Sequence, residues 1–370
     1  MRPNVHASAS AHVRAPSRAP VWLLDDAPIM GGAEAFALRL CAWIRASDPS
    51  RRTLIACPPA SELADRCASA GIEVLPVSYP LPAPRHAPAA ARAVWRLRKL
   101  LSHAPEGTLL IANTARAQAY AILATRATRG RLSLVSVMHE QDSARRGTAR
   151  WALRRFGGVA AVGDAGVRTY RDALSGTTVA SVTNFLEPGE VERAAAARVP
   201  PPGSARPLVG VLSRMFAGKG IVELIDELAR VPDAWSELRV AAPFQDAAYT
   251  ASVRDRIAAH DLASRVSLLG GVTDVRAFIA GVDVVVVPST ATEGQPTVVL
   301  EALAHGRPVI VREHIWQSGY EGLPVRHYAD HEELARALTA PAPPGVPAAA
   351  LTARFDPAAV LATLERAARD

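Results

Sequence analysis

The sequence predicts an α/β protein made of two doubly wound halves. Short apolar runs alternate with longer helical patterns, which is typical of parallel sheets covered by helices on both faces. The length of 370 residues suits two domains at roughly 150 residues each. Apolar residues make up 49% of the chain and charged residues 21%, so large cores can form and a wholly disordered chain is excluded.

The first doubly wound domain is expected over residues 20–186. Its strand candidates are short runs rich in Val, Leu and Ile, and the segments between them show the apolar spacing of helices. The expected strands are 21–24, 53–56, 73–77, 109–112, 132–137, 159–162 and 179–182, with helices at 33–44, 60–70, 90–103 and 116–128.

The pattern stops over 187–206, where four prolines and two glycines predict a linker between domains. A second doubly wound domain is expected over 207–345. Its strands are expected at 208–212, 238–242, 266–269, 282–287 and 308–311, and its helices at 221–230, 246–260, 275–280, 296–305 and 332–338. The remaining segment, 346–370, is expected to form a C-terminal helix over 357–369 that packs back on the first domain.

The sequence also indicates the cellular compartment of the protein. Residues 1–19 lack the apolar stretch of a secretory signal and are expected to form a disordered leader. No apolar run approaches the ~18 residues of a membrane helix. The three cysteines, Cys41, Cys57 and Cys67, lack metal-site spacing and favour a reducing compartment. We therefore expect a cytoplasmic protein, and its net charge of +7 favours acidic ligands without requiring nucleic acid.

Two glycines follow the first expected strand. Gly31 and Gly32 precede a helix, where the bare backbone lets amides approach a ligand and the helix N-terminus favours an anion. A Gly-Gly turn before a helix is also common as a simple chain reversal, so this signal needs support from elsewhere.

Nucleotide-binding motifs are incomplete in this chain. No G-x-G-x-x-G follows the first strand of either domain, which disfavours a dinucleotide dehydrogenase. Residues 213–220 resemble a phosphate loop, but Ser213 and Gly220 stand where that loop needs Gly and Ser or Thr. What remains is Arg214 and Lys219, two cations between a strand and a helix that can clamp a diphosphate. Two solvated charges would give the same pattern, and both interpretations stay open.

The most informative stretch is 289–311. A very apolar strand ends at Pro288, a polar loop holds Glu293, and Pro296 suits the start of a helix that contains Glu301. The first amides of such a helix favour phosphate. The two carboxylates can then accept hydroxyls of a sugar and of a ribose. Two unrelated glutamates are the alternative, but strand, loop, proline and the following turn all agree with a site.

These motifs resemble the donor site of retaining GT-B glycosyltransferases of the glycosyltransferase family 4 type. The resemblance spans residues 20–340, and its second half is the more specific. It implies two Rossmann-like domains that face each other across a cleft. The matching residues are Glu293 and Glu301 with seven residues between them, Gly306-Arg307-Pro308-Val309, Arg214 with Lys219-Gly220, Gly31-Gly32-Ala33-Glu34, and Thr183-Asn184.

The resemblance also implies a role for each site residue. Arg214 and Lys219 would hold the diphosphate and stabilise charge on the leaving group. Glu293 would hold the transferred sugar, Glu301 the ribose, and His139 would lie near the sugar, although a lone histidine is often structural. The other nucleotide-sugar contacts would come from Gly31, Gly32, Gly294, Gln295, Pro296, Thr297 and Val298.

Two positions depart from the family pattern. Many members carry Gly-Gly after the strand expected at 308–311, where this chain has Arg312-Glu313. The usual Ser after 159–162 is Gly163. The pocket for the sugar and base is therefore expected to differ, and no motif identifies the acceptor.

The implied activity is retaining transfer of a hexose-type sugar from a nucleotide-diphosphate sugar. The acceptor would be a glycan, a lipid-linked sugar or a small molecule in glycan or glycoconjugate biosynthesis. The family implies no metal and no other cofactor, and no Asp-x-Asp stands at a strand end. Two alternatives stay open: another GT-B enzyme such as a nucleotide-sugar epimerase, and a non-catalytic binding protein with a degenerate GT-B fold.

Two segments combine cations with tryptophan, 92–99 around Trp95 and 145–156 around Trp151. On helices, such segments can lie on an anionic bilayer, which would place the protein at the inner face of the membrane. The alternative is a solvated face with one buried Trp in each, and the sequence favours that alternative. A nucleic-acid partner is disfavoured because no stacking or finger motif accompanies the charge.

Overall fold

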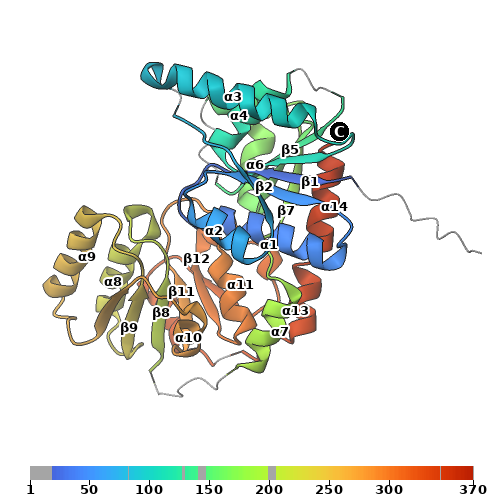
Figure 1. Ribbon diagram of the computed structural model, residues 1–370. Helices are drawn as coiled ribbons and strands as arrows, with labels where there is room; N and C mark the ends of the chain where they lie inside the picture. Colours follow the sequence, from blue (N-terminus) through green and yellow to red (C-terminus); the bar gives the residue numbers. More distant parts are fainter. Residues whose placement is uncertain are drawn as a thin grey trace, which may run out of the picture.

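The computed structural model describes residues 19–81, 83–126, 130–140, 147–198, 206–341 and 343–369. It contains two α/β domains, each built on a parallel sheet with helices on both faces (Figure 1). The first domain runs from blue to green and the second from yellow to orange, and the red helix α14 near the end of the chain returns to the first domain. The expected leader, apart from Ala19, lies outside the described residues.

The first domain is built on a seven-stranded parallel sheet in the order β3-β2-β1-β4-β5-β6-β7. Its central strands are apolar throughout and buried on both faces, as a sheet between two helix layers requires. The strands are β1 (Val21–Leu24), β2 (Thr53–Cys57), β3 (Glu73–Pro76), β4 (Leu109–Ala112), β5 (Ser133–Met138), β6 (Gly158–Val162) and β7 (Thr178–Val182).

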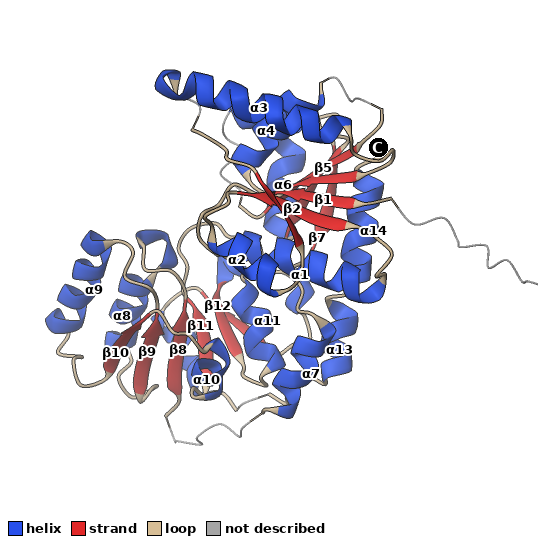
Figure 2. Cartoon of the chain, in the orientation of Figure 1, coloured by secondary structure: helices blue, strands red, loops and turns tan. Residues whose placement is uncertain are grey.

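Two helix layers cover this sheet (Figure 2). Alternate residues of each strand point to opposite faces, so one set packs against α1 and α2 and the other against α3 to α6. The helices are α1 (Gly32–Ser47), α2 (Glu62–Ser69), α3 (Ala87–Ser102), α4 (Ala115–Thr125), α5 (Gly147–Leu153) and α6 (Asp164–Ala173).

The second domain has a six-stranded parallel sheet in the order β10-β9-β8-β11-β12-β13, the same arrangement without a seventh strand. Its strands are β8 (Leu208–Leu212), β9 (Glu237–Ala241), β10 (Val266–Gly270), β11 (Val284–Val287), β12 (Val309–Arg312) and β13 (Val325–Tyr328). Its helices are α8 (Ile221–Arg230), α9 (Ala247–Ala259), α10 (Val275–Ala280), α11 (Thr297–Ala304) and α12 (His331–Thr339).

The segment predicted to be a linker is helical in its first part, so the expected break in the helical pattern is wrong there, while its role as a linker stays a prediction. Helix α7 (Pro188–Ala196) begins with Pro188 at its first position, where a missing amide costs no hydrogen bond. Val191 and Ala194 of this helix are buried, and α7 packs against α11. The helix was not predicted because it begins with proline and glycine, and its stability comes from tertiary packing.

The end of the described chain returns to the first domain. Helix α13 (Ala348–Arg354) packs on α7, and α14 (Pro357–Ala367) lies against β5, β6 and β7 (Figure 1). Arg51 fixes this arrangement, because its Nη2 lies 2.8 Å from Glu365 Oε1 while its Nε donates to the Ala19 carbonyl at 2.8 Å. The first domain is thus completed by residues that follow the second domain in sequence.

Two further findings concern the whole described chain. Its cysteines, Cys41, Cys57 and Cys67, are buried and not in disulfides. None of the helices within the described ranges combines the length and apolarity needed to span a bilayer.

Candidate functional site

The predicted diphosphate clamp lies at the strand ends of the second sheet. β8 and β11 are neighbours where the strand order reverses, which is where doubly wound sheets bind ligands. Lys219 follows β8, and its Nζ lies 2.5 Å from Oε1 of Glu293, which follows β11. Ser289 donates its hydroxyl to the same oxygen. Lys219 and Glu293 are 17% and 16% exposed, so the pair is shielded yet reachable.

Arg214 shares the loop of Lys219. Both cations stand near the ring of Phe216, with Arg214 Cζ 5.1 Å and Lys219 Nζ 5.7 Å from its centroid. The loop then turns at Gly220 with a left-handed φ of 67°, and a Cβ there would collide with the Pro288 carbonyl. The loops after β8 and β11 therefore pack directly on each other, which holds Lys219 beside Glu293.

Helix α11 begins at Thr297, one residue after Pro296, which lies just before the helix rather than in its first turn. Its N-terminus faces the start of α1 in the other domain, because a Cβ on Gly32 would lie only 3.4 Å from Thr297 Oγ1. The amides of Thr297 and Val298 and the glycine turn therefore meet across the domain boundary. Two helix N-termini that each favour an anion are brought to one place.

A buried carboxyl lies in the first turn of α1. Glu34 has its pKa raised to about 7, first by burial and then by the charge of Asp25, while Arg214 of the second domain lowers it. The effect of Arg214 shows that α1 starts opposite the cationic clamp. Glu34 belongs to the Gly31-Gly32-Ala33-Glu34 motif, but no separate role for it was predicted.

His139 follows β5 and is held by the first domain. Its Nε2 lies 2.9 Å from Asn113 Oδ1. The Asn113 amide group donates to Asp25 Oδ2 and to the Ala33 carbonyl, at 2.8 Å each. Since that nitrogen serves two acceptors, Oδ1 must accept, and the His139 proton is assigned to Nε2. Burial lowers the pKa of His139 to about 4, so the ring is neutral at pH 7.

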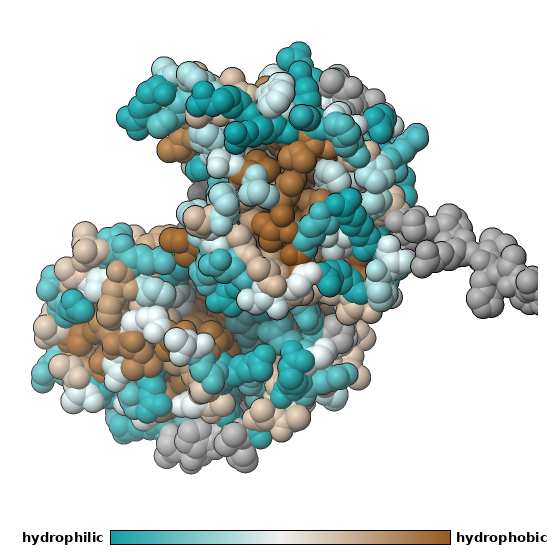
Figure 3. Space-filling view, in the orientation of Figure 1, coloured by the Kyte–Doolittle hydropathy of each residue, from teal (hydrophilic) through white to brown (hydrophobic). Residues whose placement is uncertain are grey.

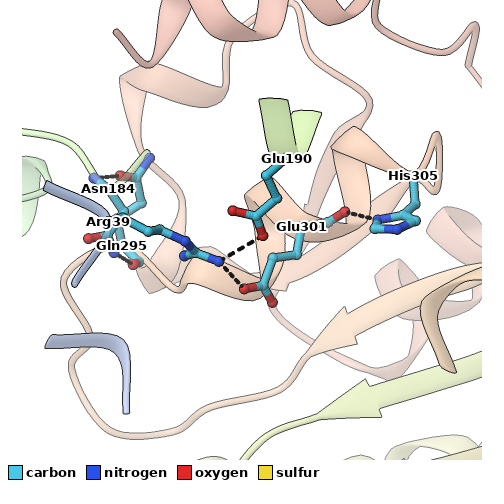
Figure 4. Close-up of polar contacts among 6 residues, drawn as sticks. All are labelled: Arg39, Asn184, Glu190, Gln295, Glu301 and His305. Atoms are coloured by element: carbon cyan, nitrogen blue, oxygen red, sulfur yellow. Dashed lines mark hydrogen bonds and ion pairs between the residues drawn. The ribbon is translucent and has the colours of Figure 1, made fainter. Parts of the chain in front are cut away.

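The loop between Glu293 and α11 contacts the first domain. A Cβ on Gly294 would lie 2.8 Å from the carbonyl oxygens of both His139 and Val162, so only glycine fits without movement. Gln295 Oε1 accepts the Asn184 backbone amide at 2.6 Å, and the Asn184 side chain donates to the Gln295 carbonyl (Figure 4). These groups join the domains, and the sugar-binding role of Gly294 and Gln295 stays a prediction.

Glu301 belongs to an ion cluster between the domains. Arg39 of α1 places its Nη2 2.9 Å from Glu301 Oε1 and 3.1 Å from Glu190 Oε1 of α7 (Figure 4). The Glu301 side chain is 21% exposed, and His305 Nδ1 lies 2.8 Å from its carbonyl oxygen. The predicted ribose contact stays a prediction, and a ribose there would share the carboxylate with Arg39.

The two departures from the family pattern have structural partners. Gly163 has a φ of 82°, and a Cβ there would lie 2.6 Å from Gln317 Oε1. Gln317 in turn donates to the carbonyl of Gly294, so glycine at 163 makes room for a residue that supports the loop between β11 and α11. Arg312 lies 2.6 Å from Glu227 Oε1 and is fixed within the second domain.

The structure brings most of the predicted residues to the domain boundary. Lys219 and Glu293 form the second-domain half, the glycine turn lies opposite, and His139 enters through the first-domain network. Figure 3 shows the surface hollowed between the first domain and the region of α8 and α9. Within the described ranges, no group of three or more His, Cys, Asp or Glu side chains is placed to hold a metal.

Sequence reasoning missed the polar residues that position these groups. Arg39, Glu190 and Asn113 have no motif around them. A usable signal existed for Arg39, a lone cation inside the apolar run FALRLCAWI, because such a charge needs a buried partner. Glu190 and Asn113 carry no comparable signal.

Residues 206–340 match the family described as glycosyl transferases group 1. This match covers the second domain and confirms the resemblance found in the sequence. No curated protein sequence matches the chain.

Solved structures similar to the chain are GT-B glycosyltransferases. HepE of Anabaena, in complex with UDP and glucose, is 21% identical with a TM-score of 0.69, covering 95% of this chain and 94% of HepE. Sucrose-phosphate synthase of Thermosynechococcus elongatus is 17% identical with a TM-score of 0.65, at 95% and 93% coverage. The lipopolysaccharide outer core galactosyltransferase WaaB is 16% identical with a TM-score of 0.63, at 94% coverage of both chains. These likenesses show the fold.

Proposed function

We propose that the chain, whose second domain matches the glycosyl transferases group 1 family and whose fold resembles GT-B enzymes, moves a hexose-type sugar from a nucleotide-diphosphate sugar to an acceptor with retention. The acceptor class, a glycan, a lipid-linked sugar or a small molecule, is left to experiment. The observation that carries the proposal is the Lys219–Glu293 pair at the switch point, opposite the glycine turn of the first domain.

The cations supply what a leaving diphosphate needs. Arg214 and Lys219 offer a guanidinium fork and an ammonium in a partly buried site, where charge stabilisation is stronger than in water. The amides at the start of α11 add partial positive charge. When a diphosphate binds, Lys219 can exchange part of its contact with Glu293 for phosphate oxygens. Glu293 can then also accept hydrogen bonds from hydroxyls of the sugar, alongside the one from Ser289.

The transfer needs positioning more than a strong base. The bond from the anomeric carbon to the diphosphate oxygen breaks, and the acceptor oxygen bonds to that carbon on the same face. The acceptor proton passes to the leaving diphosphate. The half-buried, neutral His139 suits a hydrogen bond to the sugar rather than proton removal, because its pKa is about 4.

Metal independence is part of the proposal. Arg214 and Lys219 would take the charge-stabilising role that a divalent cation serves in other sugar transferases. Turnover should therefore persist in excess chelator. Loss of turnover that magnesium or manganese restores would contradict this part alone.

The donor can be identified by a thermal-shift panel of UDP, GDP, ADP and their sugars. A ligand that binds only the folded state raises its melting temperature, and UDP is the first candidate because HepE structures hold UDP and UDP-glucose. Incubation with the preferred donor and pooled acceptors then separates the functions. Release of nucleotide diphosphate with an α-linked product from an α-linked donor supports retaining transfer.

Other results of these assays would favour one of the alternative functions. An epimer of the nucleotide sugar without transfer would indicate the epimerase alternative. A thermal shift without turnover for any acceptor, with all site residues intact, would favour the non-catalytic binding protein. Inverted product would contradict retention while leaving transfer in place.

A further inference from the structure

We propose that helices α3, α4 and α5 of the first domain form a docking surface for an anionic lipid bilayer. This basic aromatic surface is distinct from the transfer site, and its test does not depend on the proposed function. It consists of Arg92, Trp95, Arg96 and Lys99 of α3, Leu123 and Arg126 of α4 and the turn after it, and Arg150, Trp151, Arg154 and Arg155 of α5 and the turn after it.

Helix α3 separates its apolar and cationic residues cleanly. Ala93, Leu97 and Leu101 are buried at a spacing of four and hold the helix on the sheet. The opposite stripe, at steps of three and four, contains Arg92, Trp95, Arg96 and Lys99, all exposed. Trp95 is 62% exposed, and Lys99 Nζ lies 5.8 Å from its ring. The interpretation that this Trp is buried is therefore wrong.

Helix α5 repeats the arrangement. Ala152, Leu153 and Phe156 are buried, whereas Trp151 is 48% exposed. The Arg155 guanidinium lies over the Trp151 ring, 3.9 Å from its centroid. The expected basic segment began at residue 145, and its first two residues lie outside the described ranges.

The three helices form one layer. α4 packs against both α3 and α5, and Arg98 of α3 donates to the Leu123 carbonyl of α4 at 3.2 Å. Leu123 is itself 38% exposed. None of the three helices contains Asp or Glu, so the layer carries cations and apolar groups without compensating acids. Figure 1 shows α3 and α4 on the side of the first domain away from the second.

This composition fits a bilayer interface. Tryptophan has an apolar body and a polar N–H, and it favours the headgroup region, while long Arg and Lys side chains reach lipid phosphates from the same depth. Both exposed Trp rings have a cation beside them, so each can enter the interface with its charge still at the phosphates. Nucleic acid is the competing anionic partner, and the oligonucleotide arm of the test below distinguishes it from a bilayer.

Flotation of the full-length protein with vesicles tests the proposal. Vesicles of neutral phosphatidylcholine are compared with vesicles that also contain phosphatidylglycerol, at low and high salt. We expect binding to the anionic vesicles at low salt, little to neutral ones, and loss at high salt because the charges are screened. Tryptophan emission should shift to the blue only with anionic vesicles.

Two sets of variants locate the contact. Arg92→Gln with Arg96→Gln should weaken partition about fivefold per charge. Trp95→Ala with Trp151→Ala should weaken it about tenfold. Because these side chains are exposed, the melting temperature should not change.

The matched controls lie in the second domain. Phe244 is 46% exposed with Arg254 Cζ 5.4 Å from its ring, so Phe244→Ala removes an equivalent aromatic contact elsewhere. Arg336, 66% exposed, supplies the charge control as Arg336→Gln. Neither control should change flotation.

Several results would overturn the proposal. They are absence of binding to either vesicle, equal binding to neutral and anionic vesicles, and equal loss in the controls. Tighter binding of a short single- or double-stranded oligonucleotide than of anionic vesicles, with the same variants impaired, would assign the surface to nucleic acid instead.

Discussion

The two domains share one topology but have opposite chemistry at the same topological position. The switch point of the second sheet, between β8 and β11, presents Arg214 and Lys219 around Glu293. The switch point of the first sheet, between β1 and β4, presents Asp25 and Asn113, with Asp26 and Glu34 nearby. In each case neighbouring strands diverge and leave room for loops.

The difference shows that the fold supplies a place and the loops decide what it binds. A cationic switch point suits a diphosphate. At the acid-rich one, Asp25 is fully buried and accepts from Asn113, which in turn contacts His139, so these polar groups position first-domain residues. The site is therefore made by facing two copies of one architecture with complementary loops.

The largest effect is expected from removing the cations at the switch point of the second sheet. Arg214→Ala and Lys219→Ala should each lower turnover by about 10²–10³, because each removes a preorganised charge from the leaving diphosphate. Steady-state rates with a melting curve for each variant measure this. Arg206→Ala is the control, because Arg206 is an exposed cation of the same domain that pairs with Asp233 away from the site. Near-wild-type turnover in a folded Lys219→Ala variant would remove the donor assignment.

The two glutamates of the motif are expected to have different roles within the second domain. Glu301→Gln should weaken nucleotide-diphosphate binding about tenfold to a hundredfold, since it loses charged hydrogen bonds to the ribose. Glu293→Gln should leave that binding nearly unchanged but lower turnover, because its partner is the transferred sugar. Calorimetry and steady-state rates separate the two effects.

Arg39 makes a matched control available for this pair. Glu190→Gln also breaks a contact of Arg39 but leaves Glu301 in place. It should not change nucleotide binding. If it weakens binding as much as Glu301→Gln does, the effect comes from the interdomain cluster and not from a ribose contact.

A smaller effect, confined to the first domain, is expected from Gly157→Ala. A Cβ there would lie 2.5 Å from the Ala368 carbonyl at the end of α14, so the helix must shift. We expect a loss of about 1–3 kcal/mol in the free energy of unfolding, as for other overpacked positions. Gly176→Ser is the control, since an added Cβ there meets nothing within 4 Å, although its φ of 81° adds some strain. Nucleotide binding by the second domain should be retained, and its loss would show that the domains do not respond separately.

The smallest effect at neutral pH is expected from His139. Because its folded pKa is lowered to about 4 from 6.5, its contribution to stability is complete above about 6.5. That contribution is lost as the pH falls through 4. Unfolding measured against pH should show this acid limb, and His139→Gln should remove it. A rate profile whose acid limb lies near 6.5 and disappears in His139→Gln would instead make His139 a titrating catalytic group.

Much of the fold could be predicted from sequence because strands buried on both faces of a parallel sheet consist of continuous runs of apolar residues. β1, β4 and β8 lie where the apolar runs predict them. β13 at the sheet edge has no such run, since in its sequence VRHY a half-buried Arg326 and an exposed His327 stand between two buried residues. Helix α7 was not predicted, because its stability comes from packing on α11 rather than from the helix propensity of its own sequence.

The residues of the candidate site likewise include some that were predictable from sequence and some that were not. Lys219 and Glu293 were predictable because each lies at a strand end beside a recognisable turn. The contact of Arg39 with Glu301 was not, since 262 residues separate the two in sequence and each is surrounded by ordinary helix residues. Polar partners brought together only by domain packing leave no local pattern.

The return of α14 to the first sheet imposes an order on biosynthesis. This helix covers β5, β6 and β7, yet it leaves the ribosome only after the whole second domain has been made. Until then the apolar face that α14 later covers is open to solvent. A stalled or truncated chain would therefore leave that face exposed and prone to aggregation. The first domain can therefore become fully folded only in chains in which the second domain has already been made.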